Sequence, residues 1–224
     1  MTNAKKIIDI VVNICYSIKN AKGNIKMKVQ VDQIAEIRSG YLFKEGIRED
    51  KGGNVAVVQL KDVDDRGIID LKNLYKIKLE NIEKSNFIIA GEILFKAKTN
   101  KPIAAIVSNI PHNTIVTAHY FVIKIKNLIV RPGYLAWYLN QRPAQIYFDK
   151  HAGGTRIQII NKQVLGNLEI EVPDLNIQAK IEKLYLLNNK EQSLMDLLKE
   201  KKKILIEAKL LSFIKKHGRG KLNE

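Results

Sequence analysis

The stretch Leu165-Gly-Asn-Leu-Glu-Ile-Glu-Val-Pro-Asp-Leu-Asn-Ile-Gln-Ala-Lys-Ile-Glu-Lys-Leu184 decides the fold, because a strand pattern changes into a helix pattern within it. Leu168, Ile170 and Val172 alternate with polar residues, and this two-residue period is typical of a half-buried strand. Pro173 cannot continue a strand ladder, and the apolar residues after it have helical spacing. The stretch therefore predicts the boundary between a globular domain and a long helix.

The predicted helix covers residues 175–213 and would be about 58 Å long at 1.5 Å per residue. Its apolar stripe drifts around the helix, because the polar residues 188–193 interrupt it. A stripe of this length exceeds what a domain of this size can cover, so we expect it to pair with another helix. The side chains expected in this coiled-coil seam are Ile177, Ile181, Leu184, Leu187, Leu194, Leu198, Leu205 and Leu211.

Short runs rich in β-branched residues precede this boundary, separated by Gly, Asn, Asp or Pro. The runs that predict strands are Val55–Leu60, Lys76–Leu79, Phe87–Ala90, Glu92–Phe95, Ile103–Val107, Ile115–Ile125 and Leu168–Val172. Pro132-Gly133 is a turn signal, and the aromatic and leucine residues after it predict a short helix against the sheet. We therefore predict an α+β fold of short mixed strands and small helices, followed by the long helix.

Residues 3–19 predict an amphipathic helix, since apolar residues recur there at three- and four-residue steps. Its apolar face has no Trp or Phe, which favours packing on the protein or on a partner helix over binding to a membrane surface. No cleavage site and no uninterrupted span of ~20 apolar residues follow, so we expect a cytoplasmic protein without a membrane partner. The predicted divisions are the N-terminal helix (1–28), a domain (29–173), the long helix (174–213) and a basic tail (214–224).

The charge of the chain is strongly positive: 38 Lys and Arg face 23 Asp and Glu, which gives a formal net charge of +15. This excess favours a polyanionic partner, either nucleic acid or an anionic membrane surface. A generally lysine-rich composition is the alternative explanation. Cys15 is the only cysteine, so neither an internal disulfide nor a cysteine-based zinc site is expected.

No sequence pattern indicates catalysis. All five prolines are isolated, whereas amino-methyltransferases carry a Pro-Pro-aromatic loop. Gly218-Arg-Gly-Lys221 lacks the spacer of a phosphate-binding loop. The four histidines are scattered singly, and Asp174 lies too close to Gln178-Ala-Lys180 for the ligands of a metal-dependent nuclease. We therefore expect no catalytic residue, no metal site and no cofactor.

Three loop segments carry residues that suit DNA, because Arg and Lys hold phosphates while Arg, Gln, Asn, Ser and Thr meet base edges. The strongest candidate is a glycine-rich loop that contains Lys150, His151, Gly153, Gly154, Thr155, Arg156 and Gln158. The second group is Arg38, Ser39, Tyr41, Lys44 and Arg48, and the third is Lys96, Lys98, Thr99, Asn100 and Lys101. For each group an ordinary solvated loop is the alternative, since turns favour the same residue types.

The junction at residues 165–184 resembles the one that ends each target-recognition domain in the specificity subunits of type I restriction-modification systems. Further pieces support the resemblance in the same order along the chain, namely Val58-Gln-Leu-Lys-Asp62 with Gly67-Ile-Ile69, Ala90–Phe95, Pro132–Asn140 and Gly153–Lys162. The resemblance implies a non-catalytic protein in which each target-recognition domain reads half of a bipartite site in double-stranded DNA. It also implies that the long helix docks methyltransferase subunits, with the restriction subunit as an additional partner.

The junction occurs once in this sequence, whereas two recognition domains are needed to read a bipartite site. We therefore predict a homodimer that reads a palindromic split site. Pairing with a different specificity chain is an alternative within the same family. A DNA-modifying enzyme with an unrecognised site and a basic coiled-coil scaffold that reads no sequence are the alternatives from other classes.

Overall fold

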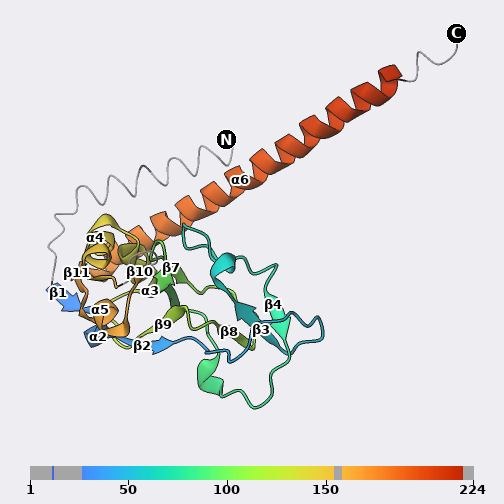
Figure 1. Cartoon of the computed structure of the whole chain (residues 1–224). Coiled ribbons are helices and arrows are strands. Elements are labelled where there is room, and N and C mark those ends of the chain that lie inside the picture. The colour runs from blue at the N-terminus through green and yellow to red at the C-terminus, as the bar shows by residue number, and fades with distance from the viewer. Residues whose placement is uncertain (1–11, 13–26, 154–157, 219–224) are drawn as a thin grey trace, which may run out of the picture. The chain divides into compact units, whose positions relative to one another are not determined.

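The computed structural model describes residues 12, 27–153 and 158–218 of the 224-residue chain (Figure 1). The chain divides into two compact units, Met1–Leu184 and Tyr185–Glu224. The predicted α+β architecture is confirmed: short strands and small helices precede one long helix, α6 (Leu175–Gly218). The helix predicted over residues 3–19 lies outside the described residues except for Val12.

A four-stranded antiparallel sheet forms the middle layer of the domain. Its strand order is β2 (Ala35–Ser39), β9 (Tyr120–Ile125), β5 (Ile93–Lys96) and β7 (Ala104–Ile106). Successive side chains of a strand point to opposite faces, so Ile93 and Phe95 enter one core while Leu94 enters another. The sheet is therefore covered on both faces.

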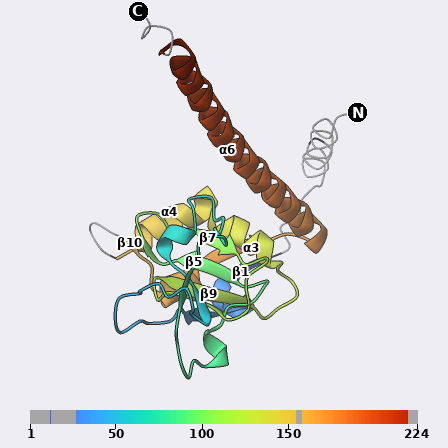
Figure 2. The same cartoon turned by 90° about the vertical axis from the view of Figure 1, so that its right-hand side faces the viewer.

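Small helices cover the first of these faces. They are α2 (Val31–Ile34), α3 (Pro132–Leu139), α4 (Arg142–His151) and α5 (Lys162–Asn167). Figure 2 shows α3 and α4 together beside β5 and β7, and all four helices contribute to one core cluster. The rings of Phe95 and Phe148 meet in this core at 5.0 Å between centroids. Pro132 occupies the first turn of α3, where a missing N–H costs no helical hydrogen bond.

A three-stranded sheet covers the second face. Its order is β4 (Tyr75–Ile77), β3 (Val55–Val58) and β8 (Thr114–Val116), with β3 antiparallel to β4 and parallel to β8. Val58 and Val116 pack with Leu94, Tyr120 and Val122 of the larger sheet. The domain thus has three layers: helices, a four-stranded sheet and a three-stranded sheet.

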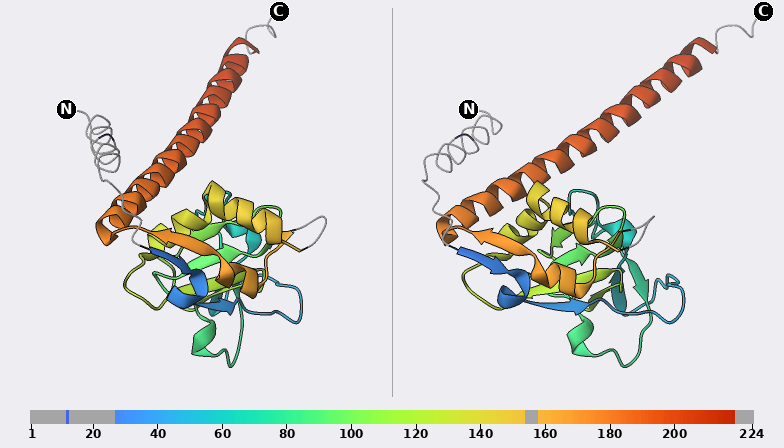
Figure 3. Two further views of the ribbon diagram at one scale, coloured as in Figure 1. Left: turned by 90° about the vertical axis from the view of Figure 1, so that its left-hand side faces the viewer. Right: turned by 60° about the vertical axis from the view of Figure 1, so that its left-hand side comes forward.

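Two short ladders complete the domain. In Figure 3, β1 (Met27–Gln30) runs beside β11 (Glu169–Val172), and Met27 is the register partner of Val172. The second ladder joins β6 (Lys98–Thr99) to β10 (Gln158–Ile159), which are almost 60 residues apart along the chain. Neither pairing follows from the local sequence pattern.

Two predicted strands differ from the observed ones. Phe87–Ala90 is not a strand but a loop after the short helix η2 (Lys84–Asn86), although Ile88 is buried. The Glu92 carboxylate accepts the N–H of Ile89 at 2.9 Å, and Gly91 has a φ of +90°, so the segment turns instead of pairing. The run Ile115–Ile125 is interrupted by a turn, and its two halves, β8 and β9, belong to different sheets.

Helix α6 begins two residues after Pro173 and is 44 residues long, which confirms the predicted strand-to-helix change. The carbonyl of Asp174 accepts the N–H groups of Ile177 and Gln178 at 2.9 and 3.0 Å and so closes the first turn. Among the predicted seam residues, Leu194, Leu198, Leu205 and Leu211 are each more than half exposed. None of the described helices has the length and the apolar content that are needed to cross a membrane.

Candidate nucleic-acid interface

The ladder of β6 and β10 brings together two of the three predicted DNA-contacting groups. Lys98 is the register partner of Ile159, and Thr99 is the register partner of Gln158. The N–H of Ile160 extends this ladder by donating to the carbonyl of Ala97 at 2.8 Å. Residues that follow strand β5 and residues of the glycine-rich loop therefore occupy one edge of the domain.

The glycine-rich loop has a closed base. Gly153 and Ile159 exchange both backbone hydrogen bonds, with N–O distances of 3.0 and 2.9 Å. On the N-terminal side, the N–H of Ala152 donates to the carbonyl of Phe148 and ends helix α4. The predicted contact residues Gly154, Thr155 and Arg156 lie between the two sides of this base, outside the described residues.

The side chains around this base are predominantly basic and exposed. Lys98, Lys101 and Lys150 are all exposed, as is His151, whose Nδ1 lies 2.8 Å from the carbonyl oxygen of Tyr147. Residues 93–168 contain ten Lys and Arg but a single acidic residue, Asp149. Such an imbalance gives a positive local potential, which is what a phosphate backbone requires.

The one carboxylate of residues 93–168 is already engaged. Asp149 accepts a hydrogen bond from the Nε2 of Gln158 at 2.9 Å, which ties helix α4 to strand β10. The amide of Gln158 is therefore oriented by a neighbour, and its residue is only partly exposed. This pairing fixes the position of β10 relative to the end of α4.

The group Arg38, Ser39, Tyr41, Lys44 and Arg48 lies on other elements, and the structure brings none of it into the ladder. Arg38 donates to the carbonyl of Phe87 at 3.0 Å and pairs with Glu92 at 3.2 Å. Since the side chain of Glu92 is 5% exposed, this ion pair serves to hold the loop before β5. Lys44, Arg48 and Ser39 are exposed, whereas the ring of Tyr41 packs edge-on to Phe43.

Lys96 has a structural position that the sequence prediction did not anticipate. Its side chain is buried, and its ammonium donates to the carbonyl of Val63. Desolvation by burial lowers the pKa of this ammonium from its usual value. The ammonium of Lys96 is enclosed in this way and is not available to a phosphate, so we correct the prediction and remove Lys96 from the proposed DNA contacts. The side chain of Arg38 is 26% exposed, and its contact with DNA stays a prediction.

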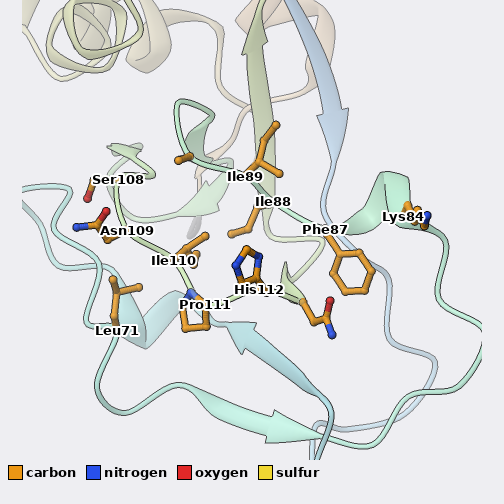
Figure 4. A pocket seen from close by; sticks show the side chains of 12 residues that line it. Leu71, Lys84, Phe87, Ile88, Ile89, Ser108, Asn109, Ile110, Pro111 and His112 are labelled. Carbon is orange, nitrogen blue, oxygen red and sulfur yellow. The ribbon is translucent and has the colours of Figure 1, made fainter.

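An open cleft of 850 Å³ lies elsewhere on the domain, between the loop 84–90 and the loop 108–113 (Figure 4). Its lining is mainly apolar, including Phe87, Ile110 and Pro111, and Lys84 and His112 are its titratable side chains. None of the DNA-contacting residues predicted from the sequence lines this cleft. Among the side chains that the structure describes, no three His, Cys, Asp or Glu residues gather as ligands of a metal ion.

The geometry defines a three-layer α+β domain that carries a basic loop surface and continues into a long helix with exposed apolar side chains. The family model described as "Type I restriction modification DNA specificity domain" matches residues 24–208. The chain therefore belongs to this family, whose members are generally not catalytic. A search of curated proteins returned no match.

Solved structures of low sequence identity share the fold. The S subunit of a type I restriction-modification system from M. genitalium has a TM-score of 0.57 at 16% identity, over 81% of this chain and 44% of that one. The HsdS subunit from Thermoanaerobacter tengcongensis has a TM-score of 0.54 at 16% identity, over 98% of this chain and 53% of that one. The present chain thus spans about half the length of these relatives.

Proposed function

We propose that this chain reads one half of a bipartite duplex DNA site as the non-catalytic specificity component of a type I restriction-modification system. The observation that carries the proposal is the β6–β10 ladder, which joins two candidate groups into one surface within a segment that has ten basic residues and one acidic residue. Phosphate contacts hold a reader in register, and polar side chains beside them read base edges. The ladder offers both kinds of residue.

Within this surface, the residues divide by chemistry. Lys98, Lys101 and Lys150 are exposed ammonium groups suited to phosphates. Thr99 on the ladder, together with Thr155 and Arg156 of the loop, supplies the donors and acceptors that base edges require, while Gln158, whose Nε2 is bonded to Asp149 and whose Oε1 is buried, holds the ladder beside them. We propose Ser39, Lys44 and Arg48, with Tyr41 beside them, as a secondary contact region.

The exposed apolar side chains of α6 support a helical partner. Leu194, Leu198, Leu205 and Leu211 are between 56% and 68% exposed, and burying each against another helix would remove apolar surface from water. We propose a second copy of this chain as that partner, with both copies reading a palindromic split site. Methyltransferase subunits, and with them the restriction subunit, would dock on the paired helices. Pairing with a different specificity chain is the second candidate.

Sedimentation of the purified chain at micromolar concentration tests the pairing. We expect a dimer that Leu198→Glu converts to a monomer, while Glu200→Gln on the same helix leaves the dimer intact. A wild-type chain that sediments as a monomer would refute the homodimer. Cross-linking between two differently tagged copies distinguishes pairing of this chain with itself from pairing with a different specificity chain.

Selection from randomised DNA duplexes tests the reading of sequence. We expect a split motif whose two halves are related by symmetry. Recovery of no motif would favour a basic scaffold. Turnover of DNA by the isolated chain with added S-adenosylmethionine or a divalent metal would favour a DNA-modifying or DNA-cleaving enzyme.

A further inference from the structure

The start of α6 is held on the domain by one buried amide. Gln178, in the first turn of the helix, is 0% exposed. Its Oε1 accepts the N–H of Arg131 at 2.9 Å, and its Nε2 donates to the carbonyls of Ile129 and Pro173, both at 2.8 Å. A single side chain thus joins the helix to the loop before α3 and to the end of the strand-to-helix connection.

The next turn of the helix adds a charged contact to the same loop. Glu182 follows Gln178 by four residues and so lies on the same face of α6. Its Oε2 pairs with the Nε of Arg131, and its side chain is only 14% exposed. Arg131 therefore meets α6 twice, through its backbone N–H and through its guanidinium.

The position of Arg131 is in turn set by the fold. It is the residue that precedes α3, and its carbonyl accepts the N–H of Leu135 at 3.0 Å. A Cβ at Gly133 would lie 2.2–2.5 Å from side-chain atoms of Glu182, so the glycine leaves the space that this carboxylate occupies. The next residue of α3 is tied to the sheet, since the hydroxyl of Tyr134 donates to the carbonyl of Glu171 in β11.

A helix can follow a strand without side-chain contacts such as those of Gln178 and Glu182 with the loop before α3. An apolar residue at position 178 would bury equally well, but it would leave the N–H of Arg131 and the carbonyl of Ile129 without this partner. Hydrogen bonds also depend on direction, whereas apolar packing does not. The cluster of Gln178, Arg131 and Glu182 therefore restricts the first two turns of α6 to one orientation on the domain.

We propose that Gln178, Arg131 and Glu182 are positioning residues that fix how α6 leaves the recognition domain and thereby determine the number of base pairs between the two half-sites. The inference rests on the proposed function, in which a second domain reads the other half-site beyond the paired helices. One base pair corresponds to about 3.4 Å along DNA, so a small change at the start of the helix is enough to admit a different spacer.

Amide hydrogen exchange of the full chain without DNA tests the cluster by itself. In Gln178→Leu, we expect the amides of residues 176–183 to exchange about tenfold faster or more, because three hydrogen bonds are lost. Amides of β5 and β9 should keep their wild-type rates. Lys183→Ala, an exposed position on the same turns, is the matched control. Wild-type exchange of residues 176–183 in Gln178→Leu would overturn the inference.

Selection from duplexes with half-sites at variable spacing tests the consequence. Wild type should return one spacer, whereas Gln178→Leu and Gly133→Ala should return the same half-site sequence with two or more spacers. The double variant Arg131→Glu, Glu182→Arg should restore the single spacer that Arg131→Glu alone loses. An unchanged single spacer in both Gln178→Leu and Gly133→Ala would refute the positioning role. If wild type selects no split motif at all, the proposed function fails, and the exchange result still decides whether the cluster holds the helix.

Discussion

Replacement of Lys98, Lys101 and Lys150 by alanine should reduce the salt dependence of DNA binding. All three side chains are exposed and lie in or near the β6–β10 ladder, within a segment of the sequence, residues 93–168, whose single carboxylate is that of Asp149. Each lysine that neutralises a phosphate releases about 0.9 counterion from duplex DNA when the protein binds. The triple variant should therefore release fewer ions.

The size of the effect follows from the number of contacts. Loss of three phosphate contacts should make the plot of log affinity against log salt shallower by about 2.7. Between 50 and 200 mM salt, the affinity of the wild type should then fall about 40-fold more than that of the variant. Because phosphate contacts carry no base information, the selected sequence should stay the same.

Fluorescence anisotropy with a labelled duplex over this range of salt measures the slopes. The matched control replaces Lys72, Lys76 and Lys78 by alanine, since these lysines are also exposed but lie in the segment 41–86, where nine basic and nine acidic residues balance. The control should keep a slope close to that of the wild type. Equal loss of slope in both triple variants would show that the ladder surface is not the phosphate-binding site.

Three further predictions concern the fold that supports this surface. Gly40→Ala should lower stability by about 1–3 kcal/mol in chemical denaturation, because its Cβ would lie 2.3 Å from a backbone oxygen of the adjacent segment, whereas Gly46→Ala meets nothing within 4 Å and should be nearly neutral. Asn140→Ala should cost about 2 kcal/mol or more, since the Asn140 amide both accepts from and donates to the backbone of buried Ala104 at 2.8 Å; an unchanged denaturation midpoint would contradict this. Burial raises the pKa of Tyr120, so the unfolded chain loses this proton first as the pH rises, and stability should fall above about pH 10 more steeply in the wild type than in Tyr120→Phe. Parallel curves for those two proteins would contradict the assignment.

The sequence predicted the elements whose signals are local. The strand-to-helix change at Pro173, the short helix after Pro132 and most strand positions depend on periodicity and turn chemistry within a few residues, and these predictions are confirmed. The loop at Phe87–Ala90 was predicted as a strand because its residues are apolar, but only Ile88 is buried, and it makes one backbone hydrogen bond to Thr114 instead of a ladder. A short apolar run in the sequence is compatible both with a buried loop and with a paired strand.

The candidate surface is formed by residues that are far apart along the chain. The sequence pattern around each of them does not show that they meet in the fold. Lys98 and Gln158 meet only because β6 pairs with β10. Lys96 was grouped with the loop lysines, although it is the last residue of strand β5. Both faces of this strand are covered, so its sequence lacks the usual alternation of polar and apolar residues that would have marked it as a strand. Arg38 was assigned to DNA as a member of a basic cluster near the start of the domain, since the local sequence does not show that its partner is Glu92, 54 residues away along the chain.

The distribution of charge along the chain bears on the two explanations of the net +15. A lysine-rich composition would raise basic residues along the whole chain without removing acidic residues from one part of it. Instead, residues 41–86 carry nine basic and nine acidic residues, while residues 93–168 carry ten and one. The second segment contains both strands of the β6–β10 ladder and the loop at its end. The scarcity of carboxylates in the segment that holds both strands of the ladder and the exposed Lys98, Lys101 and Lys150 favours contact with a polyanion over a general bias in composition.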